Sequence, residues 1–303
     1  MMKFKRCIKL FTPPLVYILY SKLLNILKLK SKERFYKINN YEIILPPEHC
    51  LDTYQKQFNR YDKFLPEFSK YITDGVIIDI GANVGDTLYG IFQPTATTKY
   101  ICIEPEPYFF SYLKKNTQRL PPSEQKRITL LNIAISMEDK ILSFSREKGT
   151  ARQNKKGTLD IHAKSIDCIV EELSFPIEEY KLIKIDTDGY DYDCILSGKH
   201  FFLKTSAAIF WENDFSSTGT FQKYLEAVKL LLNCGYTKFY IFDNYGDFIT
   251  TTTGKDILYL LKYQLKSVTN IYYFDILACK NNNINFIDSV IESIIRNNKD
   301  TTI

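Results

Sequence analysis

Three acidic residues stand at corresponding places in the sequence, at or near the ends of short apolar runs. Asp79 lies in the run VIIDI, Glu104 ends KYICIE and Asp186 ends LIKID. Two glycines, Gly81 and Gly85, follow the first run closely. Carboxylates in such positions can bind hydroxyl or ammonium groups, or accept a proton from a reacting hydroxyl. The pattern therefore indicates a ligand-binding edge with acid–base chemistry.

The segment DIGANVGDT, residues 79–87, follows a predicted strand and opens a predicted helix. In open α/β sheets ligands bind at the carboxyl ends of strands, and Gly81 allows a tight turn there. Asp79 and Asp86 would repel a pyrophosphate, and the loop lacks the G-x-G-x-x-G spacing. These acids suit a ligand with an ammonium and a sulfonium group, as in S-adenosylmethionine, with Glu104 on its ribose hydroxyls. The alternative is an ordinary strand–turn–helix whose helix is capped at Asp86 or Thr87.

Asp186 ends the fourth predicted strand, at the same edge as this loop. Methyl transfer from a sulfonium needs a positioned acceptor, and an alcohol acceptor also needs a group to take its proton. Asp186 is the candidate for that role. Lys184 shares its strand face and could orient the carboxylate or the acceptor; alternatively it is a strand lysine paired with a neighbouring acid.

Glu212 follows the fifth predicted strand and is expected to face the same cleft. Together with Asp186 and Asp214 it could hold a hard divalent cation through oxygen ligands. A site without metal, with Glu212 supporting Asp186, is the simpler interpretation, so a metal is possible but not favoured.

Apolar, β-branched runs recur along the body of the chain and alternate with helical patterns. Strands are predicted at residues 76–80, 99–104, 128–133, 182–186, 207–211, 236–242 and 271–279. Helical patterns follow the second, fourth and fifth of these. The pattern predicts an α/β fold: a doubly wound, mostly parallel seven-stranded sheet, Rossmann-like, with helices on both faces and an antiparallel closing strand.

The remaining segments divide the chain around this core. A short strand at 41–45 and a helix at 49–71 form an N-terminal extension, and a helix is expected at 286–296. The predicted units are a basic amphipathic arm at 1–34, the extension at 35–74, the ligand-binding domain at 75–280 with a polar insertion at 141–165, and a helical tail at 281–303.

Composition and charge exclude several classes. Of 303 residues, 45% are hydrophobic and 25% charged, as in globular proteins. The net charge of +5 is concentrated in residues 1–34, which carry nine basic groups and one acid, so the rest of the chain is mildly acidic. An acidic body is a poor surface for nucleic acids. The seven scattered cysteines form no CxxC pair, which argues against a structural zinc site or a disulfide framework and favours a reducing, cytoplasmic setting.

The N-terminal arm is too interrupted to span a bilayer. Its longest uncharged run has 12 residues, Leu10 to Ser21, whereas a spanning helix needs about 20. Leucines at helical spacing with lysines between them suit a helix on an anionic membrane surface. The alternative is a first helix that packs on the domain with its lysines in water.

Five successive motifs of the chain resemble those of the FkbM-type methyltransferases. They are DIGANVGDT, ICIEPEP, LLNIAIS, SIDCIVEE and LIKIDTDGYDYDCILSG, and they cover residues 60–215 approximately. The family more often has Glu where this chain has Asp188 and Asp191. The resemblance implies a class I, S-adenosylmethionine-dependent methyltransferase fold that acts mostly on hydroxyl groups of sugars and natural products.

The resemblance also implies roles for individual residues. The first motif would line the methionine end of the cofactor, Glu104 would hold the ribose, and Pro105 and the stretch from Asn132 would flank the adenine. The expected cofactor-binding residues are Asp79, Gly81, Asn83, Gly85, Asp86, Thr87, Glu104, Pro105, Asn132, Ile133 and Ala134, and the expected catalytic residues are Asp186, Lys184 and Glu212.

These observations predict an S-adenosylmethionine-dependent O-methyltransferase that acts on a sugar hydroxyl of a surface glycan or polysaccharide precursor. It is expected in the cytoplasm, with the basic arm in peripheral contact with the inner face of the cytoplasmic membrane. The alternatives are an NAD- or nucleotide-sugar-dependent enzyme, or an inactive cofactor-binding protein of the same fold. The acceptor, the hydroxyl position and the oligomeric state do not follow from the sequence.

Overall fold

The computed structural model describes residues 32–147, 150–153, 157–214, 218–265 and 273–299. Almost all of the basic arm predicted at 1–34 therefore lies outside the described residues. Among the described helices, none is both long and apolar enough to cross a membrane.

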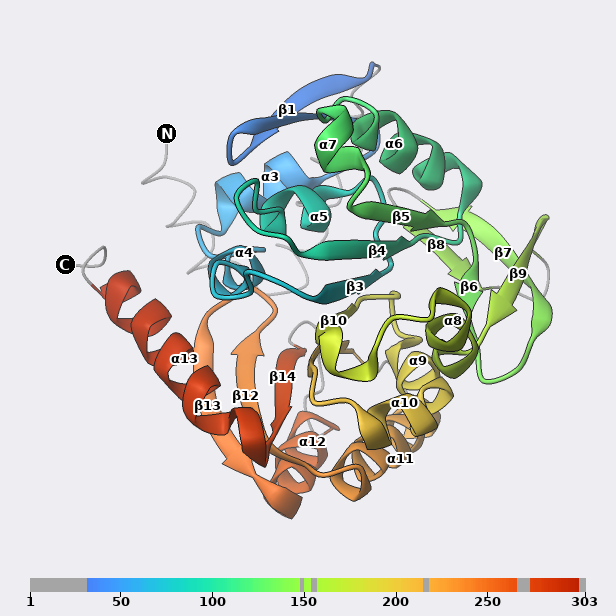
Figure 1. Ribbon diagram of the computed structural model, residues 1–303. Helices are drawn as coiled ribbons and strands as arrows, with labels where there is room; N and C mark the ends of the chain where they lie inside the picture. Colours follow the sequence, from blue (N-terminus) through green and yellow to red (C-terminus); the bar gives the residue numbers. More distant parts are fainter. Residues whose placement is uncertain (1–31, 148–149, 154–156, 215–217, 266–272, 300–303) are drawn as a thin grey trace, which may run out of the picture.

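A central eight-stranded sheet organises the molecule (Figure 1). Its strand order is β13-β12-β14-β11-β10-β3-β4-β5. The strands are β3 (Val76–Ile80), β4 (Lys99–Ile103), β5 (Ile128–Leu131), β10 (Tyr180–Ile185), β11 (Ala208–Asn213), β12 (Tyr236–Asp243), β13 (Phe248–Thr253) and β14 (Phe274–Lys280). The five strands from β11 to β5 are parallel, and β14 is antiparallel to both β11 and β12. The predicted doubly wound sheet with an antiparallel closing strand is confirmed, with β13 as one strand more than the seven predicted.

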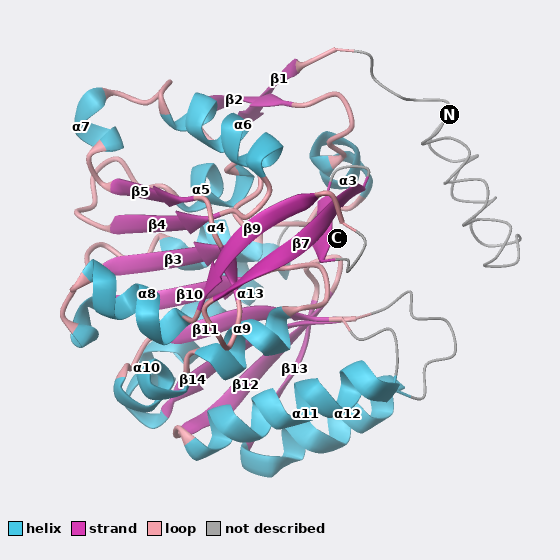
Figure 2. Ribbon diagram, turned by 90° about the vertical axis from the view of Figure 1, so that its right-hand side faces the viewer, coloured by secondary structure: helices cyan, strands magenta, loops and turns pink. Residues whose placement is uncertain are grey.

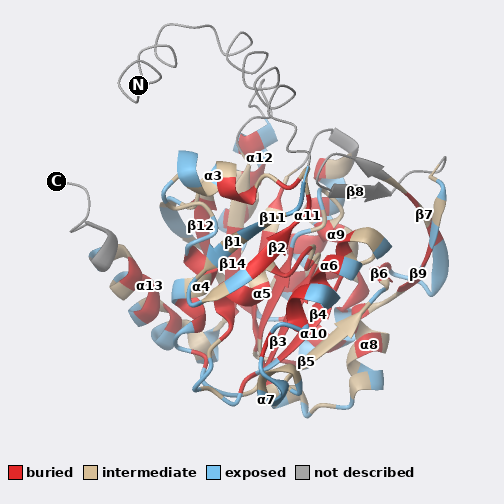
Figure 3. Cartoon of the chain, turned by 90° about the horizontal axis from the view of Figure 1, so that it is seen from above, coloured by how far each residue is buried: buried red, intermediate tan, exposed pale blue. Residues whose placement is uncertain are grey.

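Helices cover both faces of this sheet, as the alternating pattern predicts. The helices are α3 (Leu51–Gln57), α4 (Phe64–Ser69), α5 (Asp86–Ile91), α6 (Pro107–Thr117), α7 (Pro122–Gln125), α8 (Ile166–Leu173), α9 (Asp191–Ser197), α10 (Lys199–Lys204), α11 (Thr218–Asn233), α12 (Ile257–Leu265) and α13 (Ile284–Lys299). One apolar core joins the sheet to α8–α12 and another joins its other face to α4, α5, α6 and α13. Figure 3 shows the buried residues concentrated along the strands between these layers.

The parallel strands bury both faces because helices lie on each side. All five residues of β3, including Asp79, are buried, and β4 and β10 are buried except for one residue each. Strands β3, β4 and β5 lie side by side with their carboxyl ends at one edge (Figure 2). That edge therefore brings together the loops that carry the predicted site residues.

One prediction for the remaining segments needs correction, and one segment has more structure than its polar sequence indicates. The helix expected at 49–71 is broken into α3 and α4, because residues 58–63 form a turn in which Asp62 has a left-handed φ of 55°. The insertion at 141–165 is largely strand: β7 (Lys140–Glu147), β8 (Thr150–Gln153) and β9 (Leu159–Lys164) join β6 (Ala134–Ile135) in a separate four-stranded sheet.

The N-terminal extension packs on the core near the first predicted loop. Its hairpin, β1 (Arg34–Ile38) and β2 (Tyr41–Leu45), is antiparallel. The buried Asn116 of α6 accepts a hydrogen bond from the Ile44 N–H and donates to the Val84 carbonyl. One side chain therefore links the hairpin, α6 and the loop after β3.

Candidate functional site

A buried ion cluster joins the ends of β3 and β10. Lys184 is the register partner of Asp79 in the parallel pairing of the two strands. Its Nζ lies 3.1 Å from Asp79 Oδ1 and 3.4 Å from Asp186 Oδ2, and it donates a hydrogen bond to the Gly81 carbonyl at 3.1 Å. Lys184 and Asp79 are buried, whereas the Asp186 side chain is 49% exposed. Lys184 is thus the lysine paired with neighbouring acids, and it also holds the exposed carboxylate in place.

The two acids keep Lys184 charged. Burial alone would lower the pKa of its ammonium group, but the charges of Asp79 and Asp186 outweigh that cost and raise it. Within the described residues, Asp79 Oδ2 has no hydrogen-bond partner although it is buried. A buried carboxylate oxygen without a partner is costly, so it is a ready acceptor for a ligand donor at this edge.

The loop after β3 touches the backbone at Asp186. Gly81 has a φ of 78°, and a Cβ built there would lie 1.8 Å from the Asp186 carbonyl oxygen. Gly85 (φ 91°) and Asn83 (φ 45°) also have left-handed conformations. Only glycine fits the first of these positions without displacing the strand end. The predicted cofactor loop and the predicted catalytic residue therefore belong to one site.

Glu104 closes the other side of this loop. Its Oε2 accepts from the Asn83 N–H at 2.8 Å and its Oε1 accepts from the Glu106 N–H at 2.9 Å. Burial raises the pKa of the Glu104 carboxyl to about 8, even though these two backbone hydrogen bonds favour the charged form. The carboxyl is therefore fixed in direction, with lone pairs left for a ligand.

The predicted adenine-side residues lie at different depths. Asn132 is exposed and donates to the carbonyl oxygens of Glu104 and Pro105, at 2.8 and 2.9 Å, so it ties the end of β5 to the end of β4. Ile133 is half-buried. Ala134 belongs to β6, and its side chain is buried in the core of the small sheet. Asn132 thus has the most exposed side chain of this group, and Pro105 and Ile133 are half-buried.

Asp86 and Thr87 form the first turn of α5 and are half-buried. Desolvation, then the charge of Asp86, raise the pKa of Asp62, and the Asp86 charge also raises the pKa values of Tyr61 and Lys184. The helix start therefore faces both the ion cluster and the turn between α3 and α4.

Glu212 extends the acidic edge beyond β10. It lies on β11 directly opposite Asp275 of β14 in the antiparallel register, and both residues are half-buried. Burial, then the charges of Asp186 and Asp275, raise the pKa of Glu212 well above its usual value, while a hydrogen bond from Tyr273 opposes this. Glu212 is thus near Asp186, as predicted, and it is one of a row of acids along three neighbouring strands.

Four residues of this region were missed by the sequence reasoning. Asp275 and Tyr273 could have been found, because an antiparallel strand begins at the edge where its parallel neighbours end. Tyr61 and Asp62 carry no signal in the sequence, since their position depends on the break between α3 and α4.

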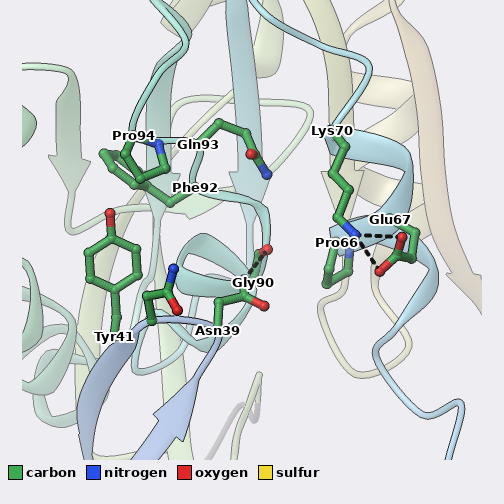
Figure 4. Close-up of a pocket in the computed structure, with 10 residues that line it drawn as sticks. Asn39, Tyr41, Pro66, Glu67, Lys70, Gly90, Phe92, Gln93 and Pro94 are labelled. Carbon is green, nitrogen blue, oxygen red and sulfur yellow. Dashed lines mark hydrogen bonds and ion pairs between the residues drawn. The ribbon is translucent and has the colours of Figure 1, made fainter.

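The described residues contain no group of three or more His, Cys, Asp or Glu side chains arranged to hold a metal ion. A separate hollow of about 310 Å³ lies at the far end of α5, lined among others by Tyr41, Lys70 and Gly90 (Figure 4). None of the predicted site residues lines it.

Comparisons with known proteins find one family and several solved structures that are similar to this chain. No curated protein sequence matches the chain. The FkbM methyltransferase from Methylobacillus flagellatus is 14% identical, with a TM-score of 0.43, over 76% of this chain and 50% of that one. This chain therefore spans about half the length of that protein. An O-methyltransferase from Bacillus cereus, solved with S-adenosylhomocysteine, is 11% identical, with a TM-score of 0.41, over 72% of this chain and 80% of that one.

The profile of the methyltransferase FkbM domain matches residues 79–238, more than half of the chain. The match begins at Asp79 and includes Glu104, Lys184, Asp186 and Glu212, the residues that form the edge described above. This protein belongs to the FkbM methyltransferase family.

Proposed function

We propose that this protein is an S-adenosylmethionine-dependent O-methyltransferase that acts on a sugar hydroxyl. The observation that carries the proposal is the contact between Gly81 and Asp186. It joins a glycine loop suited to the cofactor with an exposed carboxylate suited to deprotonate an acceptor. A methyl donor and an acceptor must meet at one place, and this contact provides it.

In this proposal, the first loop binds the methionine end of the cofactor. The unpartnered Asp79 Oδ2 and the carboxylate of Asp86 would face its ammonium group, with Gly81, Asn83, Gly85 and Thr87 shaping the loop. Glu104 would accept hydrogen bonds from the ribose hydroxyls, while Pro105, Asn132, Ile133 and Ala134 border the adenine.

Asp186 would accept the hydroxyl proton as the new O–CH₃ bond forms and the S–CH₃ bond breaks, which leaves S-adenosylhomocysteine and a protonated carboxyl. Lys184 is a positioning residue, since it holds Asp186 and the Gly81 carbonyl without reaching the exposed side of the carboxylate. Glu212 supports the same edge.

The acidic residues of the site and the family together indicate the class of acceptor. A row of carboxylates suits a molecule with many hydroxyl donors, and the family resemblance favours a sugar of a surface polysaccharide precursor. A place at the inner face of the cytoplasmic membrane, with residues 1–34 on anionic lipid, follows from the charge of that arm. The functional unit would be residues 75–280, with the extension at 35–74 packed on it and the tail at 281–303.

Calorimetric titration with S-adenosylhomocysteine and, separately, with NAD tests the proposal. We expect micromolar binding of S-adenosylhomocysteine alone, as is common for enzyme ligands. Binding of NAD instead would favour the dehydrogenase alternative. Absence of S-adenosylhomocysteine binding in folded protein would contradict the cofactor assignment.

A further inference from the structure

Carboxylates line the acceptor side of the proposed site on three adjoining strands. Asp186 follows β10, Glu212 lies on the neighbouring β11, and Asp275 is the register partner of Glu212 on β14. Two acids directly opposite each other in a sheet repel and destabilise it unless a cation lies near them. Lys184 does not meet that need, because Asp79 and Asp186 already pair with it.

The mutual repulsion of these acids raises their pKa values. After burial, the charges of Asp186 and Asp62 raise the pKa of Asp275 well above its ordinary value. The pKa of Glu212 is raised in the same way by Asp186 and Asp275. A cationic ligand would relieve this repulsion and allow the carboxyls to ionise.

Asp186, Glu212 and Asp275 are called the acidic wall below. The turn between α3 and α4, which lies outside the residues matched by the family, adds a fourth segment to this wall. It is anchored on the β12–β13 turn: Phe58 stacks on Tyr245 at 4.1 Å between ring centroids, and Arg60 forms an ion pair with Asp247 at 2.7 Å. Gly246 lies so close that a Cβ there would be 2.2 Å from the Arg60 carbonyl oxygen. The anchored turn fixes the two residues that follow Arg60.

Tyr61 and Asp62 follow this anchored turn and lie close enough to the site acids for their charges to interact. The Asp62 side chain is partly exposed to solvent. Desolvation by the surrounding protein atoms, then the charges of Asp86 and Asp186, raise its pKa to about 7. The charge of Asp62, then burial and the charges of Asp186 and Glu212, raise the pKa of the Tyr61 hydroxyl well above its ordinary value. Tyr61 therefore stays a hydrogen-bond donor and acceptor beside the acids.

A further buried acid, Asp191, interacts with these carboxylates and has one oxygen without a partner among the described residues. Asp191 is fully buried, and its Oδ2 accepts from the Thr187 hydroxyl at 3.0 Å. Its Oδ1 has no hydrogen-bond partner among the described residues. The charge of Asp191 raises the pKa of Glu212 and of Asp275, so it lies behind the same wall. A bound donor near this wall would reduce the cost of that arrangement.

We propose that the acceptor carries an ammonium group beside the hydroxyl that receives the methyl group, and that Tyr61 and Asp62 of the N-terminal extension bind it together with Glu212 and Asp275. This inference rests on the proposed methyltransferase function. An anionic sugar would be repelled by the wall, and a neutral one would leave the acids uncompensated. A divalent cation is the other way to compensate them, but the described residues form no group with metal-binding geometry.

The experiment compares three sugars that differ only at carbon 6: 6-amino-6-deoxyglucose, glucose and glucuronate. Each is titrated at pH 7 into full-length protein saturated with S-adenosylhomocysteine, in the presence of EDTA, and binding is followed by ligand-observed NMR. We expect the amino sugar to bind about tenfold more tightly than glucose, and glucuronate to bind most weakly.

Matched variants locate the effect. Asp62→Asn should reduce the preference for the amino sugar about fivefold while leaving S-adenosylhomocysteine affinity within about twofold. Asp74→Asn makes the same change at an exposed position before β3, at the opposite edge of the sheet, and should leave the preference unaltered.

The outcomes separate the inference from the function on which it rests. Equal responses of the three sugars, including no response from any, would overturn the charge preference. So would a preference that survives Asp62→Asn, or one that appears only when Mg²⁺ replaces EDTA. Loss of S-adenosylhomocysteine binding in the unaltered protein would instead refute the proposed function.

Discussion

The two halves of the site are built in different ways. The half around β3, β4 and β5 is held by backbone: Gly81 fits against the Asp186 carbonyl, and Glu104 accepts from two backbone N–H groups. The half around β10, β11 and β14 consists of side chains, chiefly acids, from segments far apart in the chain. The first half fits a constant ligand, and the second leaves its chemistry to residues that can change without altering the fold.

This contrast predicts that variants will separate cofactor binding from acceptor binding. Changes in the first half should act on S-adenosylhomocysteine affinity, and changes in the second on transfer alone. A variant in the second half that abolished cofactor binding would break the comparison.

The largest effect is expected for Asp186→Asn. It keeps the shape of the side chain but removes the base, so methyl transfer should fall about 10²- to 10⁴-fold, with S-adenosylhomocysteine affinity within about threefold. Transfer of a labelled methyl group and calorimetry measure the two quantities. Asp188→Asn, in the same turn at an exposed position with left-handed φ, is the control and should stay near the unaltered rate. Unchanged transfer in Asp186→Asn would remove this residue from the mechanism.

A smaller effect is expected for Glu104→Gln, which should weaken S-adenosylhomocysteine binding about tenfold to a hundredfold, because one acceptor oxygen is replaced by an amide nitrogen that only donates hydrogen bonds. The Glu104 carboxyl also makes the free energy of unfolding depend on pH. The folded pKa of about 8 lies above the ordinary 4.5, so the unfolded state releases this proton first.

The free energy of unfolding of the cofactor-free protein should therefore fall as pH rises from about 5 to about 8, by at most about 1.4 kcal/mol per pH unit from this group, and level off above that. When the free energy of unfolding is measured by urea denaturation at several pH values, it should depend less steeply on pH in Glu104→Gln than in the unaltered protein. An identical slope would mean that another group is responsible.

The smallest effect is expected for Gly246→Ala, which tests the anchoring of the α3–α4 turn. Gly254→Ala is the matched control, because Gly254 also has a positive φ, 52°, but nothing lies near its Cβ position. Both variants carry left-handed strain of about 1 kcal/mol, and the contact with Arg60 should cost Gly246→Ala about 1–3 kcal/mol more. Urea unfolding measures the difference. Equal losses would show that the two turns are not tightly packed.

The same contrast explains what could be predicted from the sequence. The parallel strands were found because each is a short apolar run, and the order of the acids at their ends followed from the topology. Gly81, Glu104 and Asp186 could be placed at one edge of the sheet because local spacing fixes where they lie. Lys184 was placed on the correct strand face, and the register supplied its partner, Asp79.

The missed parts depend on contacts between distant segments. The break between α3 and α4 forms where Phe58 and Arg60 meet the β12–β13 turn, nearly 190 residues later, and helical periodicity does not report such a contact. The strands within the polar insertion at 141–165 were not predicted, because β7 and β9 belong to a separate sheet with only a small apolar core. Asp275 was missed because acids in strands are usually solvent-facing.

The position of β14 has a consequence for how the protein is made. It lies between β11 and β12, although it is synthesised after both and after β13. Until residue 280 has left the ribosome, β11 and the β12–β13 hairpin each present an open hydrogen-bonding edge, which invites pairing with other chains. The strands that carry Asp79, Glu104 and Asp186 are complete long before this. A nascent chain therefore gains the cofactor half first, and the late insertion of one strand both closes the sheet and delivers Asp275.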